Sequence, residues 1–137
     1  MEETEKFLRQ YRDSLKEWNR LCDEAEQLRA ASTRITSNFS GMPGGGDVPT
    51  KVESALEGIE DILARADATK LLVDARRAEV EAAINALPGG RHREVMRLRY
   101  LNGMSWSRIA ERLHYDKRHV LRLRAEAVKM IQEKRCH

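Results

Sequence analysis

Four side chains near residue 120 have the types and the spacing needed to recognise the edges of DNA bases. They are Lys117, Arg118, Leu121 and Arg122. Arginine and lysine donate hydrogen bonds to guanine O6 and N7 in the major groove, and an outward leucine offers an apolar contact to a thymine methyl. On a helix these four positions share one face, and His119 lies at its edge. The spacing therefore predicts a base-contacting surface made of Lys117, Arg118, His119, Leu121 and Arg122.

A helix-turn-helix would hold this surface in place, and the surrounding apolar residues have the spacing that such a unit requires. The positions expected on its inner faces are Ile109, Ala110, Leu113, Tyr115, Val120 and Leu123. We expect Ser105 to cap a first helix that begins at Trp106. The turn is expected at residues 114–116, where His114 must take a positive φ and Asp116 can cap the second helix. The alternative is a solvated basic helix surface, which the helix-turn-helix spacing disfavours.

Charge is distributed unevenly along the 137 residues, whose formal net charge is +3. Residues 91–137 contain 13 Lys and Arg against 5 Asp and Glu, a net of +8, whereas residues 1–90 contain 12 against 17, a net of −5. A basic domain attracts phosphates and gains affinity by releasing their counterions. The C-terminal part is therefore predicted to bind nucleic acid, with double-stranded DNA as the partner.

The segment from Leu87-Pro88 to Ile131 resembles the fourth conserved region of bacterial sigma factors. The matching elements are Leu87-Pro88, the run Val95–Tyr100, Gly103, Ile109-Ala110, and the basic stretch from Lys117 to Ala127. In that family the recognition helix contacts the upstream promoter element, so the resemblance implies that the basic face meets base edges. It also implies that Arg99, Ser105 and Trp106 lie near phosphates, and Arg108 is expected to contact phosphate with them.

The sequence also departs from the sigma pattern. Ser107-Arg108 stands where two acidic residues often follow the aromatic, and Leu121-Arg122 stands where Arg-Gln is usual. A promoter preference is therefore not carried over. Residues 1–90 lack the aromatic-rich region that captures melted DNA by stacking, so the chain is not expected to open a promoter by itself.

As a whole, the chain is similar to small phage and prophage regulators of the RinA and ArpU late-transcription activator type. These proteins combine a long helical N-terminal half with a sigma-like C-terminal helix-turn-helix. The resemblance implies a phage-derived transcriptional activator in the cytoplasm of a bacterial host, associated with the nucleoid, that contacts RNA polymerase through another surface.

Two other functions remain open from the sequence. A small terminase subunit for phage DNA packaging would use the long helices to build a ring, and its size in solution would distinguish it from a monomeric or dimeric regulator. A sigma-like protein could instead occupy RNA polymerase without recognising DNA. In that case the isolated chain would show no site-specific binding.

The N-terminal half, residues 1–87, is predicted to form two long amphipathic helices joined by a flexible loop at 38–50. Apolar residues of the first helix alternate four and three apart at Leu8, Tyr11, Leu15, Trp18, Cys22 and Ala25. The expected seam of the second helix comprises Val52, Leu56, Ile59, Leu63, Ala66, Val73, Val80, Ile84 and Leu87. Lys70 and Arg77 also fall on this seam, where their stems must snorkel.

These patterns together predict an all-α fold. A coiled-coil-like antiparallel hairpin at 1–87 would precede a three- to four-helix, sigma-like helix-turn-helix domain at 88–137. The hairpin is longer than a small domain can cover, so a homodimer is the preferred arrangement. A monomer in which the C-terminal helices cover the hairpin is the alternative.

Several classes of function are disfavoured by what the sequence lacks. All four histidines lie in the basic domain, without a nearby nucleophile or carboxylate at a spacing that would assemble a catalytic site. Cys22 and Cys136 are far apart and have no metal-ligand spacing. No apolar run is long enough to cross a membrane. We therefore expect no enzyme, cofactor, metal site, small-molecule substrate or membrane partner.

Overall fold

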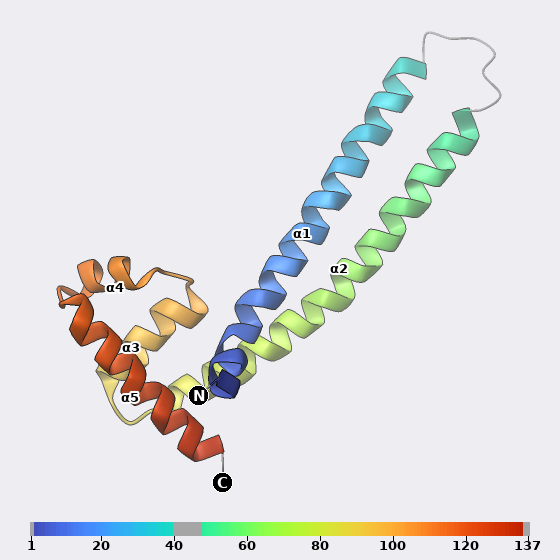
Figure 1. Cartoon of the computed structure of the whole chain (residues 1–137). Coiled ribbons are helices and arrows are strands. Elements are labelled where there is room, and N and C mark those ends of the chain that lie inside the picture. The colour runs from blue at the N-terminus through green and yellow to red at the C-terminus, as the bar shows by residue number, and fades with distance from the viewer. Residues whose placement is uncertain (1, 40–47, 136–137) are drawn as a thin grey trace. The chain divides into compact units, whose positions relative to one another are not determined.

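The computed structural model describes residues 2–39 and 48–135, including the side chains of all of these except 34–39, 48–52 and 55. Every element in these ranges is helical and none is a strand, which confirms the predicted all-α fold (Figure 1). The elements are α1 (Glu2–Phe39), α2 (Val48–Asn85), α3 (Gly90–Met96), the π-helical turn η1 (Arg97–Leu101), α4 (Trp106–Leu113) and α5 (Lys117–Arg135). Most of the predicted loop at 38–50, and Cys136, lie outside the described residues.

The chain forms two compact units. One comprises Leu15–Leu72, and the other unites Met1–Ser14 with Val73–His137. Each of the long helices α1 and α2 therefore contributes a segment to both units. The sequence-based boundary between residues 87 and 88 falls inside the second of these units, which holds the first residues of α1 and the last of α2 together with α3, η1, α4 and α5. None of the described helices combines the length and apolarity of a membrane span.

In the unit of residues 15–72, α1 and α2 lie side by side. Their shared core consists of Leu21, Ala25, Ile62 and Ala66, with Trp18 and Leu28 packed against it. Leu63, which was expected in this seam, is instead 37% exposed, and Leu56 is 50% exposed. The prediction was wrong here because the buried seam steps three residues from Ile59 to Ile62, and the leucine one position further turns outward.

The two cations predicted on the α2 seam are placed over aromatic rings of α1. In the unit of residues 15–72, the Lys70 ammonium lies 5.2 Å from the centre of the Trp18 ring. In the other unit, the Arg77 guanidinium lies 5.3 Å from the centre of the Tyr11 ring and donates a 2.9 Å hydrogen bond to its hydroxyl. Both side chains therefore remain exposed at the edge of the helix pair, and a cation–π contact with a ring of α1 holds each of them there.

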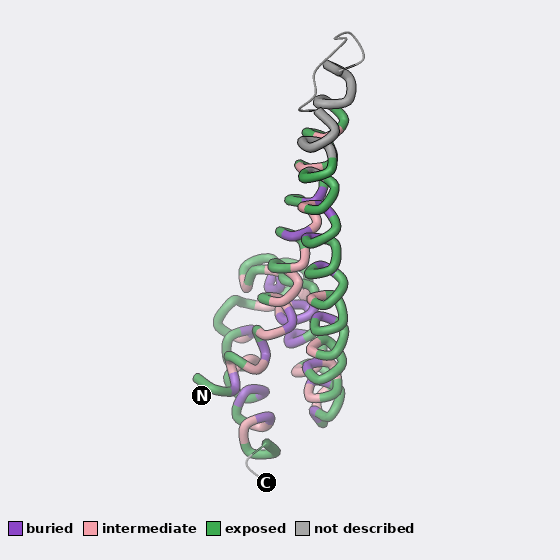
Figure 2. The backbone as a smooth tube through the Cα atoms, turned by 90° about the vertical axis from the view of Figure 1, so that its right-hand side faces the viewer, coloured by how far each residue is buried: buried purple, intermediate pink, exposed green. Residues whose placement is uncertain are grey.

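The C-terminal helices α3, η1, α4 and α5 enclose a core of their own. It comprises Val95, Leu98, Ile109, Ala110, Val120 and Leu123, with Met104, Trp106, Leu113 and Tyr115 packed against it. All six residues predicted on the inner faces of the helix-turn-helix belong to this cluster, so that prediction is confirmed. Figure 2 shows how buried and exposed positions alternate along these helices.

The π-helical turn η1 was not predicted. The amide of Asn102 donates to the carbonyl of Arg97 at 3.0 Å, which spans one residue more than an α-helical bond. The wider turn allows Leu98, Tyr100 and Leu101 all to be buried. Burial raises the pKa of the Tyr100 hydroxyl, since the low-dielectric surroundings disfavour the phenolate.

Candidate nucleic-acid interface

The first helix of the helix-turn-helix, α4, is fixed at both ends by local chemistry. At its start, the Ser105 hydroxyl accepts a 3.3 Å hydrogen bond from the backbone N–H of Arg108, as the sequence predicted. At its end, His114 takes the left-handed conformation with φ 58° and ψ 40°. This confirms the positive φ expected at that position. It also lets the chain turn sharply into α5.

Backbone hydrogen bonds complete the turn between α4 and α5. The amide of Tyr115 donates to the carbonyl of Ala110 at 3.0 Å, and the amide of Val120 donates to the carbonyl of Asp116 at 3.1 Å. Asp116 therefore occupies the N-cap position of α5. The turn holds the first residues of α5 at a fixed orientation to α4, because both helices share the core described above.

The predicted base-contacting residues occupy the first two turns of α5. Lys117, Arg118 and Arg122 are exposed, and Leu121 is 39% exposed. Val120 and Leu123 are buried on the opposite side of the helix, so the exposed face points away from the core. His119 is only half-buried, and its ring packs edge-to-face on Tyr115 with the ring centres 4.9 Å apart. The structure thus brings four of the five predicted side chains onto one exposed face, with His119 beside them.

Arg122 is held by neighbours on its own helix. Its guanidinium lies 2.9 Å from Nδ1 of His119, which can accept a hydrogen bond when that nitrogen is unprotonated. Its Nε lies 3.9 Å from a carboxylate oxygen of Glu126. Glu126 is hydrogen-bonded in turn to His92 of α3 at 2.7 Å. That hydrogen bond is the main reason that the pKa of Glu126 falls below its ordinary value, and electrostatic attraction to the neighbouring His92 and Arg122 side chains lowers it further.

The predicted phosphate contacts are placed around the start of α4, but they are not equally free. The guanidinium of Arg99 donates a 3.1 Å hydrogen bond to the carbonyl of Met104 and lies 4.8 Å from the centre of the Trp106 ring. Trp106 is half-buried against the core. Ser105 is exposed, and its oxygen accepts the cap bond while its O–H donor stays available. Arg108 is also exposed. Ser105 and Arg108 are therefore the two residues most open to an external phosphate, and of these Arg108 carries the charge.

No sequence pattern predicted that the first residues of α1 would pack beside this surface. Glu5 forms an ion pair with Arg124 of α5, whose guanidinium also lies 5.9 Å from the centre of the Trp106 ring. The guanidinium of Arg135 lies over Phe7, 3.8 Å from the centre of the Phe7 ring. These partners are more than a hundred residues apart in the chain, so no periodic pattern could have revealed them.

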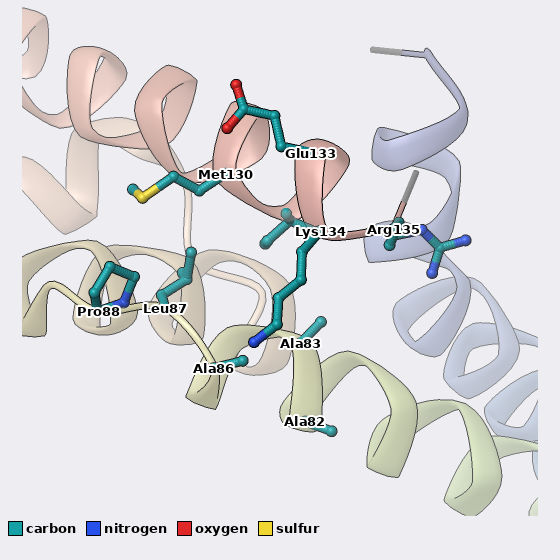
Figure 3. Close-up of a pocket in the computed structure, with 10 residues that line it drawn as sticks. Ala82, Ala83, Ala86, Leu87, Pro88, Met130, Glu133, Lys134 and Arg135 are labelled. Carbon is teal, nitrogen blue, oxygen red and sulfur yellow. The ribbon is translucent and has the colours of Figure 1, made fainter. Parts of the chain in front are cut away.

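A pocket of about 600 Å³ lies between the end of α2 and the end of α5 (Figure 3). Its lining is mostly apolar and consists of Ala82, Ala83, Ala86, Leu87, Pro88, Met130, Ile131, Glu133, Lys134 and Arg135. Lys134 extends towards Ala83 and Ala86, whereas the carboxylate of Glu133 points away from them. In the part of the chain that the structure describes, no three His, Cys, Asp or Glu side chains are grouped so as to hold a metal ion.

Comparisons with protein families, with curated proteins and with solved structures find no match to this chain.

Proposed function

We propose that this chain is a sequence-specific DNA-binding protein that inserts the start of α5 into the major groove. The observation that carries the proposal is the exposed face of Lys117, Arg118, Leu121 and Arg122 on the second helix of a helix-turn-helix. Three cationic side chains and one outward leucine match the donors and the apolar contact that major-groove recognition uses. In the helix-turn-helix motif, the N-terminal residues of the second helix contact base edges.

Affinity and specificity come from different parts of the surface in this proposal. The net charge of +8 on residues 91–137 supplies attraction to phosphates that is independent of sequence and weakens with salt. Arg108, at the start of α4, would contact the backbone and fix the register of the protein on the duplex. Arg118 and Arg122 would then discriminate between base pairs.

We infer further that the chain is a transcriptional regulator, and this inference rests on the resemblance to sigma-like phage activators. In this role it would act in the bacterial cytoplasm at the nucleoid, with RNA polymerase as a second partner. A homodimer fits the proposal because Leu56, Leu63, Leu71 and Leu72 of α2 expose apolar surface that a second copy would cover. Two copies would also bind two half-sites.

The direct test is selection of bound fragments from a random DNA library by the full-length chain at moderate salt. The mass of the complex on the enriched fragment is then measured. We expect an enriched motif with one or two copies bound. A ring of eight or more copies would favour DNA packaging. Salt-sensitive binding without any enriched motif would contradict sequence-specific recognition and would favour a polymerase-binding role.

A further inference from the structure

We propose that Arg12 of α1 is an additional phosphate contact of the DNA-binding surface. This inference rests on the proposed function and extends it to a helix that the sequence had assigned to dimerisation. Arg12 belongs to the same compact unit as the helix-turn-helix. It approaches this motif at Gly103, in the loop that joins η1 to α4.

The packing of Arg12 against the loop is close. A Cβ atom at residue 103 would overlap the guanidinium of Arg12, so this group lies directly against the bare backbone of Gly103. Gly103 also has a φ of +72°, a conformation that glycine adopts without steric cost. The loop thus requires glycine for its own backbone, and the missing side chain leaves the space that Arg12 occupies.

Arg12 meets the helix-turn-helix at a place where a DNA phosphate is expected. Gly103 is two residues before Ser105, the cap of α4, and the exposed Arg108 follows in the first turn of that helix. In helix-turn-helix proteins the first helix crosses the DNA backbone. A guanidinium beside the entry to α4 therefore lies next to the predicted phosphate contacts.

Arg12 differs from Arg99 and Arg124, the two other half-buried arginines near the entry to α4, because it has no partner to neutralise it. Arg99 donates to the carbonyl of Met104, and Arg124 is paired with Glu5. For Arg12, no hydrogen bond or ion pair is formed with any residue that the structure describes. A half-buried guanidinium loses part of its hydration, and a charge-assisted bond to an anion compensates that loss. The phosphate of a duplex bound at α4 is the anion that the proposed function supplies.

The test uses Arg12→Gln in the full-length chain, with Arg29→Gln as the matched control. Arg29 is an exposed arginine further along α1, so the control removes the same charge from the same helix. Affinity is measured on the enriched site and on scrambled DNA over a range of salt concentrations. We expect Arg12→Gln to weaken binding to both by roughly fivefold and to reduce the slope of log K against log salt by about 0.9, the value for one phosphate. Arg12→Lys should retain the slope because it keeps the charge.

A second measurement does not depend on how well a variant folds. Modification of arginines in the wild-type chain by phenylglyoxal is mapped by mass spectrometry with and without DNA. We expect DNA to protect Arg12 but not Arg29. Equal reactivity of Arg12 in both states, or a salt slope unchanged by Arg12→Gln, would overturn this inference and leave the proposed function standing. A wild-type chain that binds no DNA would overturn both.

Discussion

Replacement of Arg122 by alanine tests whether the exposed face of α5 discriminates between bases. The side chain of Arg122 is 66% exposed, and its ionic neighbour Glu126 lies at 3.9 Å on the same helix. Solvent screens an exposed pair of this kind, so the pair adds little to stability. We therefore expect the free energy of unfolding to change by less than about 0.5 kcal/mol, the usual range for exposed positions.

The expected effect on recognition is much larger. A bidentate contact of arginine with guanine contributes about 1–3 kcal/mol of discrimination, so Arg122→Ala should weaken binding to the preferred site by roughly 5- to 150-fold at 25 °C. On scrambled DNA the substitution removes only a non-specific electrostatic contribution. The loss of affinity for scrambled DNA should therefore be several times smaller than the loss of affinity for the preferred site. Preference should relax at one base pair of the site, while the other positions remain selected.

Fluorescence anisotropy with labelled duplexes of the enriched and the scrambled sequence, at one fixed salt concentration, provides the assay. Arg65→Ala removes the same side chain from an exposed position on α2 and serves as the control. Thermal melting of each variant checks the fold. The assignment of Arg122 to base recognition is refuted if its loss weakens binding to both duplexes equally, or if it lowers affinity no more than the control does.

Three further predictions concern the fold of the helix-turn-helix. Val120→Ala removes two methyl groups from a fully buried site and should lower the free energy of unfolding in urea by roughly 2 kcal/mol; an unchanged midpoint would contradict its place in the core. His114→Gly should raise stability by about 1 kcal/mol, because a left-handed backbone costs other residues roughly 1–2 kcal/mol; a lower melting temperature would refute this. The hydrogen bond from His92 lowers the pKa of Glu126 from its ordinary value of 4.5, so this carboxylate stabilises the fold above that pH. This contribution is lost as pH falls through the lowered folded-state pKa. The melting temperature of Glu126→Gln should therefore change less with pH in the acid range than that of the wild-type chain. The same pH dependence in both chains would contradict this.

The sequence was most informative where structure depends on neighbours along the chain. The inner faces of α4 and α5 follow from helical periodicity, since residues three and four apart share one side of a helix. The cap at Ser105 and the left-handed turn at His114 follow from local backbone chemistry. For the same reason the exposed face at Lys117–Arg122 could be identified as a candidate site from its spacing alone.

Finer packing within the helices could not be predicted so well. The α2 seam allowed either Ile62 or Leu63 to face α1, because steps of three and four residues both keep close to one face of a helix. The crossing of α1 and α2 selected Ile62. Similarly, the π-helical turn η1 depends on burying Leu98, Tyr100 and Leu101 together, a requirement set by the elements around it.

By itself, the sequence determined the all-α class, the helix-turn-helix and its polarised charge, because periodicity, capping and composition are local properties. Only the tertiary structure placed Glu5 against Arg124 and Arg12 against Gly103. These pairs join residues about a hundred positions apart, and each partner alone is an ordinary helix or loop residue with no distinguishing neighbours in sequence. Their contact is decided by how whole helices pack, because burial of the shared apolar core fixes which surfaces meet.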